Sequence, residues 1–164
     1  MIDENQKRKT FPIISSFEKR GEVKRWDGGN NDLALSQEYA DEGQYSLKAI
    51  LYPAKYSGVS MAHPPRDWRG FSNFEFTIFN PSKKNMMIVL KILDWDHTFV
   101  YSDRFNKNIR LAPGRNRISI FLQEIESAPA KRKMRMDQIG QISFFIKDLK
   151  EEQILFFDNI RLSG

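Results

Sequence analysis

The chain has 164 residues, of which 40% are hydrophobic and 13% aromatic, so it is long enough for one domain with a sizeable core and too apolar for a disordered chain. It contains no cysteine, which excludes disulfides, thiolate metal sites and cysteine nucleophiles. The 26 Lys and Arg residues exceed the 21 Asp and Glu residues by five, but the two signs are interspersed, so the charge does not select an anionic partner.

The first ten residues are polar and lack the apolar region of a secretory signal. The longest apolar run, Met86 to Leu90, stops at Lys91 and is far shorter than the roughly 18 residues of a membrane span. We therefore expect a flexible segment over 1–10, one domain over 11–164, and no direct membrane insertion. The chain is expected in the cytoplasm if it is complete, and outside the cytoplasm or in the cell envelope if it is a module of a longer protein.

Two local basic clusters interrupt the mixed charge pattern, at 7–9 and at 131–133, the second extended by Arg135. Both are read as solvated surface, or else as contacts for an acidic glycan, a lipid or a nucleic acid. Nucleic acid is not expected, because neither cluster has neighbouring aromatic residues on which bases would stack.

Period-two alternation predicts most of the elements. In the first half, short strands are expected over 13–18, 23–26, 33–36, 45–52 and 59–62. In the second half they are expected over 72–80, 85–95, 105–111, 116–122, 140–147 and 153–162. Single helical turns are expected near 122–127 and 136–139. No segment sustains a helical period over three turns, so the pattern predicts an all-β antiparallel sandwich, a jelly roll of two sheets and about nine or ten strands.

Two connectors support this reading. Asn80 to Asn85 is rich in turn-forming residues and suits a hairpin between two strands. Pro113-Gly114 predicts a type II turn, in which proline fixes the first central residue and glycine supplies a positive φ.

Catalytic motifs are mostly missing: the sequence has no nucleophile elbow, phosphate-binding loop or zinc-binding helix motif, and only two histidines. The acids Asp94, Asp96 and Asp103 gather near one strand end, where a glycosidase could keep its acid and base. No desolvated cleft that would raise one carboxyl pKa is evident, so we expect a protein without catalytic activity.

Several short segments resemble the carbohydrate-binding-module-like jelly rolls of the galactose-binding-domain-like superfamily. They are Ser16-Phe-Glu18, Gly43-Gln-Tyr-Ser-Leu-Lys48, His63–Phe71, Ile92–His97, Tyr101–Asn106, Leu111–Asn116 and Leu155-Phe-Phe-Asp-Asn-Ile-Arg-Leu162. Together they span about 13–162. Such domains occur as appendages of glycoside hydrolases and of bacterial envelope proteins, so the resemblance implies a carbohydrate partner and an attached catalytic or membrane domain. A more distant relative of the same shape, an assembly factor of respiratory complex I, points to protein binding instead.

The resemblance also implies a structural calcium ion where the first strand, the G-x-x-S loop and the last strand meet. Glu18 and Asp158 match the two acidic positions, with backbone carbonyls near Gln44 and Tyr45 as further ligands. Asp41 and Glu42 are additional candidates. The alternative is that Glu18 and Asp158 are strand-end residues satisfied by backbone amides or arginines. Calcium prefers oxygen ligands such as these carboxylates and backbone carbonyls.

Sugar recognition needs aromatic planes and a few polar groups on a preformed hollow. If the even-numbered side of 86–95 faces the core, the other face carries Lys91 and Trp95, with His97 just beyond. The ligand surface is expected to consist of Lys91, Asp94, Trp95, His97, Tyr101 and Arg104. Outward neighbours are expected at Glu75, Thr77, Arg117, Phe121 and Phe145, whereas Trp26 and Trp68 are assigned to the core or a sheet corner.

Arg104 has two interpretations: it binds a sugar hydroxyl or a uronate carboxylate, or it pairs with Asp94, Asp96 or Asp103 to fix the loop. A flat row of three aromatics is not found, so a short soluble chain or a sugar end is the expected ligand. The leading hypothesis is a non-catalytic carbohydrate-binding module holding a poly- or oligosaccharide, with calcium in a structural role. The main alternative is a protein-interaction domain of the same fold with no sugar ligand.

Overall fold

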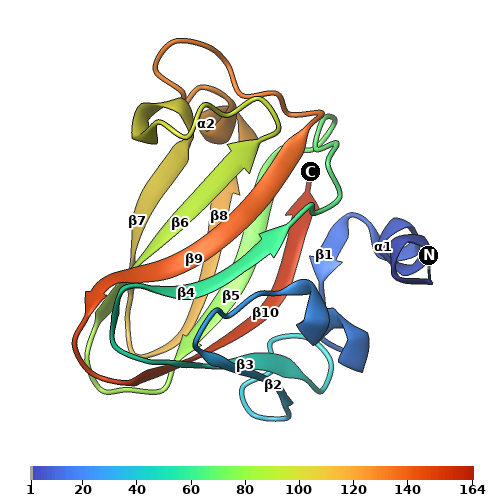
Figure 1. Cartoon of the computed structure of the whole chain (residues 1–164). Helices are drawn as coiled ribbons and strands as arrows, with labels where there is room; N and C mark the ends of the chain where they lie inside the picture. Colours follow the sequence, from blue (N-terminus) through green and yellow to red (C-terminus); the bar gives the residue numbers. More distant parts are fainter. Residues whose placement is uncertain (1) are drawn as a thin grey trace.

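The computed structural model describes residues 2–164, which form two antiparallel β-sheets stacked face to face (Figure 1). One sheet has the strand order β2-β3-β10-β5-β8, and the short β1 also pairs with β10. Its strands are β1 (Ile13–Ser15), β2 (Asp32–Ser36), β3 (Ser46–Leu51), β5 (Asn73–Asn80), β8 (Gly114–Phe121) and β10 (Gln153–Ser163). The other sheet has the order β4-β9-β6-β7, with β4 (Ala54–Ala62), β6 (Met86–Asp94), β7 (Phe105–Leu111) and β9 (Ile139–Leu149).

The ten strands found among residues 2–164 confirm the predicted all-β sandwich. The alternation in 72–80 and 85–95 places Phe74, Ile78, Ile88 and Leu90 inside, each fully buried between the sheets. Trp26 and Trp68 also belong to this core, as expected. Burial of these large side chains is the main stabilising contribution, at roughly 25 cal/mol per Å² of apolar surface removed from water.

Within residues 2–164, four helical segments accompany the strands: α1 (Ile2–Thr10), the 3-10 helices η1 (Arg20–Arg25) and η2 (Tyr101–Asp103), and α2 (Leu122–Glu126). The last confirms the helical turn predicted near 122–127. No helix in the described part of the chain is long and apolar enough to cross a bilayer.

Three local predictions differ from the structure: the hairpin at 80–85, the strand over 23–26 and the helical turn at 136–139. The connector 80–85 joins β5 to β6, which lie in opposite sheets and do not pair, so it is not the turn of a hairpin.

The segment 1–10, expected to be flexible, contains the helix α1 from Ile2 onward, and Met1 lies outside the described residues. This helix has acids in its first turn and bases in its last, which suits the helix dipole, and its Asp3 pairs with Arg25 at 2.6 Å. Because α1 has no apolar stripe, hydrophobic periodicity could not reveal it.

The expected strand over 23–26 is instead the end of η1. The Glu22 carboxylate accepts hydrogen bonds from the backbone N–H groups of Ser16 and Lys19, and these bonds fold the segment into a turn. Residues 136–139, expected to be a helical turn, form a simple turn before β9, closed by the Gln138 N–H donating to the Arg135 carbonyl.

The positive φ predicted for Gly114 is confirmed. Gly114 has a φ of +93°, and it joins β7 to β8, which lie in opposite sheets. A residue with a Cβ would be strained at this φ.

Candidate functional site

The outer face of the four-stranded sheet carries one polar row that crosses all four strands. Ser60 of β4 pairs with Ser143 of β9, Ser143 pairs with Lys91 of β6, and Lys91 pairs with Asn106 of β7. Three interstrand spacings make this row roughly 14 Å long. The side chains of Leu90 and Ile92 point to the core, so Lys91 points outward, as the sequence predicted.

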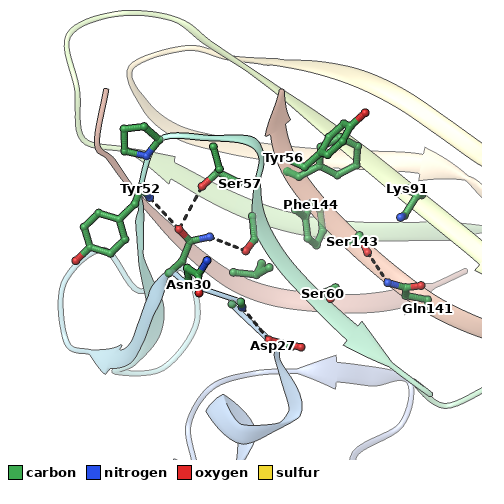
Figure 2. Close-up of a pocket in the computed structure, with 18 of the residues that line it drawn as sticks. Asp27, Asn30, Tyr52, Tyr56, Ser57, Ser60, Lys91, Gln141, Ser143 and Phe144 are labelled. Atoms are coloured by element: carbon green, nitrogen blue, oxygen red, sulfur yellow. Dashed lines mark hydrogen bonds between the residues drawn. The ribbon is translucent and has the colours of Figure 1, made fainter. Parts of the chain in front are cut away.

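A groove of about 660 Å³ lies on this face, within the size range of small-ligand sites. Loop 27–31 and the β3–β4 turn wall one end of it. Figure 2 shows Tyr52 and Asn30 at that end and Lys91, Ser143 and Gln141 at the other. The side chains that line the groove include Asp27, Asn30, Asn31, Tyr52, Tyr56, Ser60, Lys91, Arg104, Gln141, Ser143 and Phe145.

Two aromatic rings form the apolar part of the groove. Phe145 occupies the position next to the polar row, where it pairs with Gly58 on one side and Val89 on the other. The ring of Tyr56 meets the ring of Phe145 edge to face, with centroids 5.7 Å apart, and Tyr56 is 59% exposed. The Lys91 Nζ lies 5.9 Å from the centroid of the Phe145 ring.

The wall of the groove is held by Asn31. Its Nδ2 donates to the Gly58 carbonyl at 3.0 Å, and its Oδ1 accepts from the Tyr52 N–H at 2.8 Å and from the Ser57 hydroxyl at 3.2 Å. Asp27 is bridged to Ser60 through paired backbone hydrogen bonds. The loop is therefore fixed to β4 before any ligand arrives, which lowers the ordering cost of binding.

The far end of the groove is basic. The Arg104 Nε donates to the Asn106 Oδ1 at 3.0 Å, and the guanidinium lies 5.1 Å from the centroid of the Tyr101 ring. Lys91 is the cross-strand neighbour of Asn106, so the two cations occupy adjacent positions. Burial, together with the neighbouring Arg104, lowers the pKa of Lys91 below its ordinary value.

Asp94, predicted to contact a ligand, faces the other way. Its fully buried carboxylate receives two hydrogen bonds from Arg132, at 2.6 and 2.8 Å, and one from the Arg135 N–H. Arg132 also donates to Asp103 at 2.8 Å, and Arg135 pairs with Asp96. The pairing of Arg104 with these acids, which the sequence allowed, is therefore wrong, because arginines of the 127–138 loop take all three. Figure 1 shows that loop, in orange, at the same end of the sandwich as the end of β6.

Two more predicted residues lie away from the groove. Trp95 stacks on His63, with ring centroids 4.8 Å apart, and lines a separate hollow beside α1. His97 meets the ring of Phe99, and its Nδ1 is buried with no hydrogen-bond partner in the described part of the chain. Of the six predicted ligand residues, Lys91 and Arg104 line the groove and Tyr101 touches Arg104, whereas Asp94, Trp95 and His97 are outside it.

Comparison with solved structures places the fold. The chain superposes on the family 11 carbohydrate-binding module of Clostridium thermocellum, solved with a β-1,3-1,4-mixed-linked tetrasaccharide, with a TM-score of 0.69 over 93% of this chain and 94% of that one at 16% identity. A family 28 module specific for non-crystalline cellulose matches over 94% and 95% of the two chains, with a TM-score of 0.63 and 14% identity. This chain has the fold of a carbohydrate-binding module.

Agarases among the solved structures match over only a small part of their own chains. An exo-β-agarase superposes with a TM-score of 0.74 and 16% identity over 93% of this chain, but this is 24% of the agarase chain. No protein-family model and no curated protein matches the sequence. The fold is thus shown by structure rather than by sequence similarity.

The residues expected to bind calcium do come together in this module fold. The Glu18 carboxylate accepts from the N–H groups of Gln44 and Tyr45, at 2.7 and 2.9 Å. The Asp158 carboxylate accepts from the N–H groups of Asp41 and Glu42, at 2.7 and 3.0 Å. Both acids therefore hold the 41–45 loop, and a Cβ at position 43 would lie 1.9 Å from the Glu18 Oε1.

Backbone amides thus satisfy both carboxylates, as the alternative interpretation expected, and the junction also holds two acidic side chains of the type that hard cations bind. Burial, reinforced by the nearby Glu18 carboxylate, raises the pKa of Asp158 to about 6 despite its three backbone hydrogen bonds. Neither acid forms an ion pair with a lysine or arginine in residues 2–164. Within residues 2–164 no group of three or more acidic or histidine side chains is arranged to hold a metal ion, so backbone carbonyls and water would have to complete the coordination.

Several groove residues were not predicted from the sequence. Tyr56, Ser60, Gln141 and Ser143 are outward positions of β4 and β9. The strand expected over 59–62 was too short: extending the alternation back to residue 54 would have placed Tyr56 on the same face as Ser60. Of the predicted outward neighbours, Phe145 belongs to the groove, whereas Glu75, Thr77, Arg117 and Phe121 lie on strands of the other sheet.

Proposed function

We propose that this protein is a non-catalytic carbohydrate-binding module that holds a short poly- or oligosaccharide in the groove on the four-stranded sheet. The observation that carries the proposal is the Tyr56–Phe145 pair, set beside a polar row on a preformed wall. Exposed aromatic rings pack against the apolar faces of pyranoses, and the serines, Gln141 and Asn30 supply hydrogen bonds to hydroxyls. The folds of the neighbouring modules support the same function.

The chemistry of the acid cluster supports a non-catalytic role. A glycosidase needs one carboxyl group whose pKa is raised, so that it can act as a general acid. Hydrogen bonds from Arg132 lower the pKa of Asp103 to about 2. Burial alone would raise the pKa of Asp94, but bonds from Arg132 and the Arg135 N–H outweigh it and lower this pKa as well. Both carboxylates are thus bound to arginine as anions.

Phe145→Ala tests the proposed function. Removing the ring takes away the stacking surface, so affinity for a retained soluble polysaccharide should fall at least tenfold, about 1.4 kcal/mol, in affinity electrophoresis or calorimetry. Phe121→Ala is the matched control, since this aromatic is 72% exposed on the other sheet and should leave binding unchanged. Equal loss in both variants, or capture of a protein partner with no glycan retained by the native protein, would refute the assignment.

We also infer that calcium binds where Glu18, the carbonyl of Gln44 or its neighbour, and Asp158 meet. The ion would neutralise two carboxylates that have no basic partner in residues 2–164. Because its ligands come from the chain before η1, the 41–45 loop and β10, it would link these three segments. Its role would be structural. The melting temperature with and without calcium is the measurement that tests it.

A further inference from the structure

Two positive charges stand side by side at one end of the groove without a compensating acid. Lys91 and Arg104 both line it, and neither forms an ion pair with any carboxylate in residues 2–164. The three acids closest in sequence to Arg104 are bound by Arg132 and Arg135 instead. The arrangement is therefore costly in the free protein, because like charges that share a partly desolvated site repel one another.

The position of both cations is fixed by neighbouring groups rather than by acids. Asn106 accepts a hydrogen bond from the Arg104 Nε and lies directly opposite Lys91 across the β6–β7 pair. The Tyr101 ring supports the guanidinium from one side, and the Phe145 ring lies beneath the Lys91 ammonium group. Arg104 thus keeps donors free, and the burial that lowers the pKa of Lys91 also strengthens any interaction with an anion.

Among the described residues, one carboxylate lines the groove, that of Asp27, and it is remote from this end. Asp27 is bridged to Ser60, and two strands, represented by Ser60 and Ser143, separate it from Lys91. The Asp27 Oδ1 already accepts a hydrogen bond from the Gly29 N–H. The groove is therefore polarised, with its positive end on β6 and β7.

We propose that the ligand of the groove is an acidic glycan, whose carboxylate or sulfate group sits between Lys91 and Arg104 while a neighbouring sugar ring packs on Phe145 and Tyr56. This proposal rests on the proposed function and specifies its ligand class. An arginine matches the geometry of a carboxylate or sulfate with two parallel N–H donors, and the adjacent lysine adds a point charge. Charge-assisted hydrogen bonds of this kind are about twice as strong as neutral ones.

The test compares matched ligands. The probes are oligogalacturonate, the same oligosaccharide after carboxyl reduction, and a sulfated galactan oligosaccharide, titrated into the whole chain by calorimetry at low and moderate salt. At least one acidic probe should bind tenfold or more tightly than the reduced neutral probe, and its affinity should fall with salt. The uronate and sulfate arms distinguish the two sources of negative charge.

Single-residue variants test whether Lys91 and Arg104 cause the tighter binding of the acidic probe. Lys91→Gln and Arg104→Gln should each weaken binding of the acidic probe about tenfold, and should weaken binding of the neutral probe less than that. Arg104→Lys should recover part of the loss, because it restores the charge but not the paired donors. Lys83→Gln, at an exposed position in the β5–β6 turn, removes the same charge elsewhere and should have no effect.

The outcomes separate the two proposals. If the neutral probe binds as well as the acidic ones, the acidic ligand class is wrong and the carbohydrate-binding function stands. If no glycan of either class binds, both fail. If Lys83→Gln weakens binding as much as Lys91→Gln, the attraction is a property of the net charge and the Lys91–Arg104 site is refuted.

Discussion

At the residue scale, the ion pairs of one arginine determine which charged side chains stabilise the fold and which are left to bind a ligand. Arg132 forms ion pairs with both Asp94 and Asp103. Neither carboxylate is therefore left to pair with Arg104. This leaves Arg104 to stack on Tyr101 and to face the groove. The two arginines lie 28 positions apart in the sequence, which is why their roles could not be assigned by proximity along the chain.

Arg132→Met should destabilise the fold by roughly 3 kcal/mol, because it leaves the buried Asp94 carboxylate without its charged partner. Urea denaturation measures the change. Arg69→Met is the matched control: both Arg69 and its partner Asp67 are exposed to solvent, so the loss of stability should be much smaller. Similar losses in the two variants would contradict a structural role for the Arg132 cluster.

The same cluster predicts how stability depends on pH. Asp94 and Asp103 have pKa values below the 3.8 of the unfolded chain, that of Asp103 near 2. A lowered pKa in the folded state contributes stability that is present above about pH 4 and is lost as the pH falls toward 2. In Arg132→Met this acid-dependent loss should be smaller than in the native protein, as measured by urea denaturation between pH 2 and 6. An unchanged pH profile would refute the assignment.

At the element scale, β4 and β9 are joined unusually closely, and their contact shapes the groove. Gly58 leaves no room for a side chain: a Cβ there would lie 1.9 Å from the Phe144 carbonyl oxygen and 2.5 Å from the Phe145 Cα. The same glycine carbonyl receives the hydrogen bond that anchors the groove wall through Asn31. The strand pairing and the wall therefore depend on one small residue.

Gly58→Ala should push β4 away from β9, lower stability by about 1–3 kcal/mol and weaken glycan binding, because Tyr56 and Phe145 would separate. Thermal melting and ligand titration measure the two effects. Gly21→Ala serves as a control, since a Cβ at that position meets nothing within 4 Å and φ is not positive. A native melting temperature in Gly58→Ala would show that the two strands tolerate the extra methyl group.

At the scale of the whole molecule, the junction at Glu18 and Asp158 joins parts of the chain that are more than a hundred residues apart. If it binds calcium only in the folded state, saturation at a hundred times the dissociation constant adds about 2.7 kcal/mol of stability. For a domain of this size the melting temperature should rise by roughly 5–10 °C. Differential scanning calorimetry with calcium or with a chelator measures it.

Glu18→Gln removes one ligand charge while keeping an oxygen for the 41–45 loop, so the calcium-induced shift should shrink or vanish. Glu151→Gln, exposed in the turn between β9 and β10, should retain the full shift. If calcium does not raise the melting temperature of the native protein, the calcium site is refuted. Glu18 and Asp158 then serve only as acceptors for the backbone N–H groups of the loop.

Much of the fold follows from local pattern. The alternation of Phe74, Phe76 and Ile78 defines β5, and the same rule puts Lys91 on the outer face of β6, because side chains of a strand point alternately to its two faces. Pro113-Gly114 sets the turn between the sheets through its own backbone preferences. Hydrophobic periodicity does not predict elements without an apolar face, such as α1 and η1, because polar and backbone contacts stabilise them.

The sequence by itself determined the sandwich, the burial of its aromatic core and the outward direction of Lys91 and Phe145, since each depends on periodicity within one strand. Only the tertiary structure decided that Phe145 meets Tyr56, that Arg132 rather than Arg104 binds the buried Asp94, and that Trp95 stacks on His63 away from the groove. Those partners come from other strands and loops. The order of strands in a sheet and the register between them, which no local pattern encodes, bring them together.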